Sequence, residues 1–121
     1  MALSANREVN RYVDQELRTL PVKGTTHIYK GALVGLAAGL ARGLVAGDAF
    51  AGVAYEEVDN SGGGDGDVAI RVHTMGDFVH ALGGAAVANN LKPVFASADN
   101  VLTLTAAGNS FVGRQVSVVD S

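Results

Sequence analysis

Strict alternation of apolar and polar positions marks the most informative part of the chain. Val68, Ile70 and Val72 are separated by single residues, which is the period of a strand that buries one face. An apolar segment at residues 52–58 precedes them, and nine turn-forming residues at 59–67 lie between the two. The sequence therefore predicts a long β-hairpin over residues 52–72 with a wide, acidic, solvent-facing tip. The polar tip residues of interest are Asp59, Asn60, Asp65 and Asp67.

Short apolar runs separated by turn formers continue through the rest of the chain. The further expected strands cover residues 26–36, 93–96, 101–105 and 111–119, with a strand or irregular run at 40–45. Residues 83–90 are expected to form a loop or one helical turn. Turns recur about every 8–12 residues, a spacing typical of β-sandwiches and small barrels. The predicted fold class is all-β, a small β-barrel or sandwich.

The first 23 residues follow a different pattern. Their apolar side chains recur at the spacing of a helical stripe, but no capping box supports a helix, and Pro21 requires an extended predecessor. We therefore expect an extended or partly helical arm at residues 1–23 and a β domain at 24–121. The arm is either a frayed terminus or a segment that becomes ordered on a partner. Its candidate contact residues are Arg7, Arg11, Tyr12, Leu17, Arg18 and Leu20.

Glycine recurs at every fourth position between Gly31 and Gly47, a pattern that also occurs in packed transmembrane helices. The uncharged run at residues 31–41 has eleven residues, whereas a membrane-spanning helix needs about 20. Arg42 and Asp48 interrupt any extension of this run. The segment is therefore expected to form strands and turns, and no membrane partner is expected.

Charge is distributed unevenly along the chain. Residues 1–30 contain five basic and three acidic groups, whereas residues 31–121 contain four and nine. An acidic body argues against nucleic acid as its partner, while a basic leader can dock on an acidic protein surface. Residues 1–20 contain no continuous apolar run, so no secretory signal is expected.

Few residue combinations in the chain could support catalysis or metal binding. The absence of cysteine excludes disulfides, thiol catalysis and zinc–thiolate sites. His27, His73 and His80 lack the spacing of a local metal site. The acidic loop that begins at Asp59 has Ile70 where a calcium loop requires glutamate. We therefore expect no enzyme activity and no cofactor.

An ordered set of segments resembles the small bacteriophage capsid cement, or head-decoration, proteins. The resemblance extends over about residues 20–119. It is carried by Pro21-Val22, residues 28–34, 50–54 and 58–67, Gly76 before Phe78, Pro93-Val94-Phe95 and Val112-Gly113-Arg114.

The resemblance implies a compact β-barrel or sandwich on the outer surface of a tailed-phage head. Such proteins bind where major capsid subunits meet and stabilise the shell against internal DNA pressure. The resemblance further implies a homotrimer, with a dimer as the alternative. A second hypothesis is a virion-surface module that binds a host structure or carbohydrate. The absence of tryptophan and the position of the aromatic residues in predicted strands disfavour this hypothesis.

Overall fold

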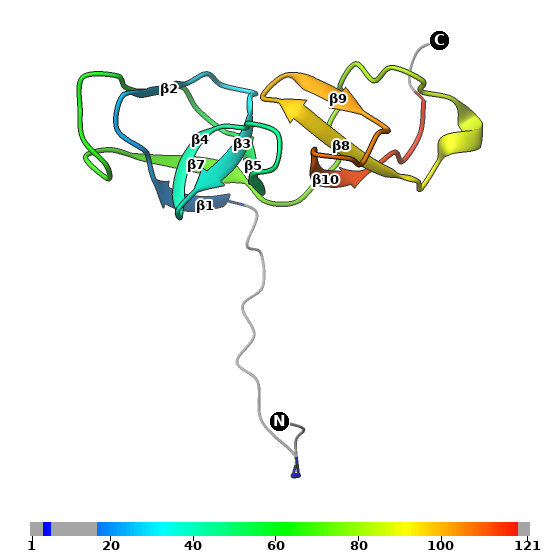
Figure 1. Ribbon diagram of the computed structural model, residues 1–121, viewed down its shortest axis with the longest axis horizontal. Helices are drawn as coiled ribbons and strands as arrows, with labels where there is room; N and C mark the ends of the chain where they lie inside the picture. The colour runs from blue at the N-terminus through cyan, green and yellow to red at the C-terminus, as the bar shows by residue number, and fades with distance from the viewer. Residues whose placement is uncertain (1–3, 6–16, 119–121) are drawn as a thin grey trace.

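The structure is a computed structural model that describes residues 4–5 and 17–118. These residues form ten strands and one short 3₁₀ helix, and the strands build three antiparallel sheets. The prediction of an all-β fold is confirmed. The sheets pack in layers as in a sandwich, and none of them closes into a barrel within the described residues (Figure 1).

The largest sheet has five strands, and a two-stranded sheet packs on it. The larger sheet has the order β1 (Leu17–Pro21), β7 (Ala69–His73), β5 (Ala49–Ala54), β3 (Leu33–Ala37) and β4 (Leu40–Gly43). The smaller sheet pairs β2 (Thr26–Ile28) with β6 (Val58–Asn60). Between the two sheets lies a core to which Ile28, Val34 and Ile70 contribute almost fully buried side chains.

The third sheet has three strands in the order β10 (Ser110–Arg114), β8 (Pro93–Ala98) and β9 (Val101–Thr103). Figure 1 shows this sheet beside the other two, joined to β7 by a long connection that contains the 3₁₀ helix η1 (Val87–Asn89). A second core joins the two parts, because Leu33 and Val53 of the large sheet pack with Ala96 of β8. The described residues therefore have two apolar cores, the second of which joins the three-stranded sheet to the five-stranded sheet.

The predicted long hairpin at residues 52–72 is wrong in its pairing. β5 and β7 are antiparallel neighbours, but their ladder is short: Val53 and Ala54 pair with residues of β7, and the Tyr55 N–H donates to the Arg71 carbonyl at 3.0 Å. Beyond them, the Glu56 carboxylate accepts the backbone N–H of Arg71 at 3.0 Å, in the place of a strand carbonyl. The chain then turns away, and β6 pairs with β2 instead.

The predicted strand at residues 26–36 is divided in two. Gly31 has a φ of 86°, and the backbone N–H of Ala32 donates to the Tyr29 carbonyl at 3.1 Å. This turn separates β2 from β3, because the left-handed conformation that Gly31 adopts cannot continue a strand. The glycine-rich segment 31–47 nevertheless forms β3, β4 and their turns, as predicted. None of the helices in the described part is long and apolar enough to cross a membrane.

The β domain begins earlier than predicted. Residues 17–21 form β1, which pairs along its whole length with β7, and Val22 is completely buried. The predicted arm therefore ends no later than residue 16, because residues 17–22 belong to the β domain. The helical spacing was misleading here because Leu20 packs against the core from an extended chain. Residues 1–3 and 6–16 of the predicted arm lie outside the described residues.

Candidate functional site

The six candidate arm residues fall into two groups. Leu17, Arg18 and Leu20 lie on β1, at the edge of the five-stranded sheet. Leu17 and Arg18 are exposed, whereas Leu20 is half-buried. The remaining three, Arg7, Arg11 and Tyr12, lie outside the described residues. Of the candidate arm residues that the structure describes, Leu17 and Arg18 are therefore accessible to a partner.

The predicted acidic tip is largely exposed to solvent, as expected, but Asn60 is buried and the loop is not free. Asn60 is only 3% exposed, and its Nδ2 donates to the carbonyls of Val22, Lys23 and Gly64 at 3.3, 3.1 and 3.0 Å. Asp65 Oδ1 accepts the backbone N–H of Gly24 at 2.8 Å. The loop is thus fastened to the chain between β1 and β2, and Asn60 has a structural role.

The two other acidic residues of this loop also stabilise turns. Asp67 Oδ2 accepts the backbone N–H of Gly64 at 2.8 Å. Asp59 Oδ1 accepts both the hydroxyl and the backbone N–H of Ser61, and these hydrogen bonds lower the pKa of the Asp59 carboxyl. The aspartates therefore hold separate backbone groups. Within the described ranges, no three histidine or acidic side chains lie close enough to hold a metal ion.

The three histidines occupy different environments. His27 Nε2 lies 2.7 Å from Glu57 Oε2, and its ring stacks on Tyr29. His73 contacts Phe78 with ring centroids 5.6 Å apart, and His80 lines a groove described below. His73 lines the same groove as His80, whereas His27 lies elsewhere, so the structure does not bring all three imidazoles together.

One buried ion pair fastens the connection between β4 and β5. Arg42 donates from Nε and Nη2 to the two carboxylate oxygens of Asp48 at 3.0 and 2.8 Å. These hydrogen bonds hold the pKa of Asp48 below its ordinary value. The side chains of Asp48 and Arg42 are 9% and 30% exposed, so this interaction is partly protected from solvent. Its position at a turn indicates a role in stability.

The outer face of the three-stranded sheet presents uncharged, largely apolar side chains to solvent. Phe95 pairs with Phe111 on one side and with Thr103 on the other, so these residues share one face of the sheet. The two phenylalanine rings meet edge to face with centroids 5.9 Å apart. Phe111 remains 52% exposed. We call Phe95, Thr103 and Phe111 the aromatic face.

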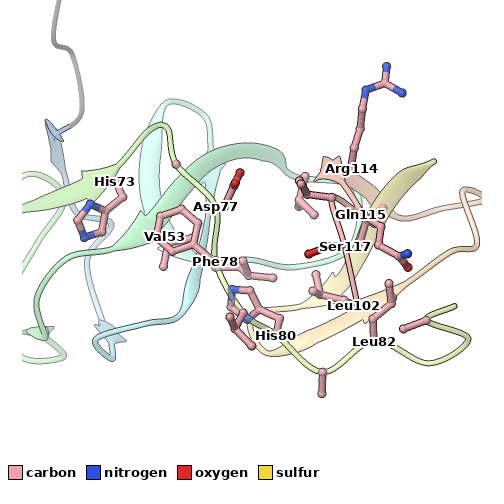
Figure 2. Close-up of a pocket in the computed structure, with 18 of the residues that line it drawn as sticks. Val53, His73, Asp77, Phe78, His80, Leu82, Leu102, Arg114, Gln115 and Ser117 are labelled. Carbon is pink, nitrogen blue, oxygen red and sulfur yellow. The ribbon is translucent and has the colours of Figure 1, made fainter. Parts of the chain in front are cut away.

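The inner face of the same sheet borders a groove of about 600 Å³ that reaches the five-stranded sheet. Figure 2 shows Val53 of β5 toward one end and Gln115, just after β10, toward the other. Phe78 and His80 come from the long connection after β7. Most of the other lining residues are apolar, so the groove favours apolar occupants.

The connection at residues 74–82 leaves large apolar side chains in water along this groove. Met75, Phe78 and Val79 are 56%, 43% and 78% exposed. Gly76 has a φ of 118°, a conformation that a residue with a Cβ rarely adopts, and so permits the bend after β7. These exposed side chains provide apolar surface at the groove that this chain's described residues do not cover.

Gln115 closes the far end of the groove. It is 7% exposed, and its Nε2 donates to the Ala86 carbonyl at 2.7 Å and to Asn90 Oδ1 at 2.8 Å. The side chain thus ties the loop around η1 to the end of β10. Its Oε1 is buried without a hydrogen-bond partner among the described residues.

Sequence reasoning did not find the aromatic face or the groove. One signal for the aromatic face was available, because Val94, Phe95 and Ala96 are consecutive apolar residues rather than an alternating set. A strand of this kind is apolar on both faces. The groove had no comparable signal, because residues of distant segments form its walls.

Comparison of the chain with protein-family models, curated proteins and solved structures gave no match. The functional proposals below therefore depend on the chain's own sequence and geometry.

Proposed function

We propose that this protein is a capsid decoration, or cement, protein of a tailed phage. It binds the outer surface of the head between major capsid subunits and stabilises the shell. The observation that carries the proposal is the uncovered aromatic face, because a three-stranded sheet with apolar side chains on both faces requires a second layer on each side. The ordered resemblance of the sequence to cement proteins supports the same function.

The size of the aromatic face suits a repeating target. From the spacing of strands and the rise per residue, one face of this sheet covers about 250 Å². A stable isolated interface buries about 800 Å² on each partner. The face is therefore too small to form a tight complex by itself. A capsid presents many equivalent sites at high local concentration, so weak contacts add together there.

The proposed partners are the major capsid protein and further copies of this chain. A homotrimer is the proposed assembly on the shell, and a dimer at two-fold positions is the alternative. The arm adds a second contact, in which its arginines form forked hydrogen bonds with carboxylates of the shell. No catalytic step, cofactor, nucleic acid or membrane contact forms part of this proposal.

A co-sedimentation assay with undecorated heads tests this function. The variant Phe111→Ala removes the more exposed ring of the aromatic face, and Tyr29→Ala is a matched control, because Tyr29 is 59% exposed and lies outside that face. We expect Phe111→Ala to weaken binding at least about tenfold, the effect of losing an interface anchor. Tyr29→Ala should bind like the unchanged chain. Equal binding by both variants, or no binding by the unchanged chain, would contradict the proposal.

A second candidate function, recognition of a carbohydrate, is favoured by one cluster of rings. Tyr55 is 39% exposed, meets His73 edge to face at 5.2 Å and lies under the Arg71 guanidinium at 4.8 Å. Exposed aromatic rings beside charged groups suit the mixed apolar and polar surface of a sugar. Binding to a glycan array that Tyr55→Ala abolishes would support this function over the first.

A further inference from the structure

The groove on the inner face of the three-stranded sheet is lined by a residue that pairs with the first residue of β1. Leu17 pairs with His73, and His73 lines the groove. Sixteen residues precede Leu17 in the sequence. We infer that in the free protein the groove is the docking site for residues 9–13 of the same chain, through Val9, Tyr12 and Val13. This inference does not rest on the proposed function.

The distances permit this docking. An extended chain covers at most about 3.3 Å per residue, so Val13 can lie up to about 13 Å from Leu17 and Tyr12 up to about 17 Å. The first groove residue, His73, is the strand partner of Leu17, and the ring of Phe78 lies 5.6 Å from the His73 ring. Val13 and Tyr12 can therefore reach the near half of the groove without any change in β1.

The chemistry of the two surfaces also matches. The three apolar residues stand at i, i+3 and i+4, so a single helical turn would place them on one face. The groove volume of about 600 Å³ lies within the range of about 300–1,000 Å³ that binds drug-sized ligands, which is enough for several side chains. Docking would cover part of the apolar surface that Met75 and Val79 now expose.

Charges at the two ends are compatible with the same arrangement. Asp77 and Arg114 line the groove and carry opposite charges. The segment likewise carries Arg11 and Asp14 on either side of Tyr12 and Val13. Arg11 within the segment and Asp14 directly after it therefore each carry a charge opposite to that of one groove residue.

The groove binds the segment of its own chain in preference to that of a second copy, because the first is covalently connected to it. A short flexible tether gives an effective concentration in the millimolar range. A second copy reaches that concentration only in very concentrated solutions. At micromolar protein, docking within one chain therefore prevails.

Disulfide trapping tests the inference directly, because the chain contains no cysteine. The test pair is Val13→Cys with Val79→Cys. The control pair is Val13→Cys with Val87→Cys, since Val79 and Val87 are 78% and 75% exposed but only Val79 lines the groove. A disulfide requires Cα atoms within about 7 Å of each other. We expect the test pair to form an intrachain disulfide at least about tenfold faster than the control pair at micromolar protein.

A second measurement uses single variants that keep the chain otherwise unchanged. Trypsin cleavage after Arg11 should be at least about tenfold faster in Val79→Asp than in the unchanged chain, because a charge in the groove releases the segment. Val87→Asp should leave the cleavage rate unchanged. Equal disulfide rates in the two cysteine pairs, disulfides only between chains, or equal cleavage in all three proteins would each overturn the inference.

Discussion

Asn60 provides a sharp test of how the acidic loop is held. Its buried side-chain amide has two N–H groups and faces three carbonyl oxygens. The carbonyls of Val22 and Gly64 each accept a second hydrogen bond from a backbone N–H. Removal of the Asn60 side chain therefore affects the Lys23 carbonyl most, because that carbonyl loses its hydrogen bond from Asn60 Nδ2. We expect Asn60→Ala to lose about two hydrogen bonds of about 1 kcal/mol each and to leave one carbonyl poorly satisfied, at about 1 kcal/mol more.

The total decrease in the free energy of unfolding is therefore about 3 kcal/mol. For a domain of this size, 1 kcal/mol corresponds to a shift of about 4–8 °C in melting temperature, so Asn60→Ala should melt about 12–24 °C lower. Urea unfolding followed by circular dichroism measures the same difference at constant temperature. The control is Asn100→Ala, at an exposed asparagine in the turn between β8 and β9. A loss below about 1 kcal/mol, or equal losses in both variants, would refute the structural role of Asn60.

Three further predictions concern the ion pair, one glycine and the N-terminal boundary. The pKa of Asp48 is lowered by hydrogen bonds, so its contribution to stability is present above the ordinary carboxyl pKa of about 3.9 and is lost as pH falls through the lower folded value. Urea unfolding at pH 7 and at pH 2–3 should thus show a smaller acid loss in Asp48→Asn than in the unchanged chain; equal losses would contradict this. Gly52→Ala should lower the free energy of unfolding, measured in urea, by about 2 kcal/mol or more, because the φ of Gly52 is 150° and a Cβ would overlap a carbonyl of β7. Gly62→Ala is the control and should be nearly neutral, because a Cβ there meets open space. Deleting residues 1–16 should leave the β domain folded by circular dichroism, whereas deleting residues 1–22 should unfold it by removing β1; the reverse result would show that the boundary at residue 17 is wrong.

Local chemistry allowed the sequence to predict several elements of the fold. In β7, Ile70 and Val72 are buried while Ala69 and Arg71 are exposed, as their alternation predicts. Pro93 begins β8, where the absence of its N–H is tolerated. These features depend on residues close together in the sequence.

Strand pairing was harder to predict, because it depends on distant segments. β7 can pair along both of its edges. Residues 17–21 pair with one edge, although they precede β7 by more than 45 positions in the sequence. The polar composition of residues 59–67 predicted a turn correctly. It could not show which residues of the turn face solvent and which pack on another turn. Asn60 packs on another turn, because it is buried and donates to the Lys23 carbonyl.

The candidate site was predicted only in part for the same reason. Leu17 and Arg18 are exposed and therefore accessible to a partner, but on a strand of the sheet. Phe95 and Phe111 become one surface only through the pairing of β8 with β10, which a single sequence does not specify. The groove depends on the path of residues 74–82, whose large apolar side chains (Met75, Phe78, Val79 and Leu82) have the spacing of a helical stripe although the segment is not helical.

The two faces of the three-stranded sheet differ in what can cover them. The groove on the inner face lies beside β1, because His73 lines it and pairs with Leu17, whereas Phe111 on the aromatic face is 52% exposed. Covering the aromatic face on both partners buries about 500 Å², a gross gain of about 12 kcal/mol. Association costs about 4–15 kcal/mol, so the net affinity of one such contact is marginal. If the proposed docking fills the groove, the aromatic face is the weak surface that remains, and the proposed function then requires a repeating partner that presents many copies of the same site.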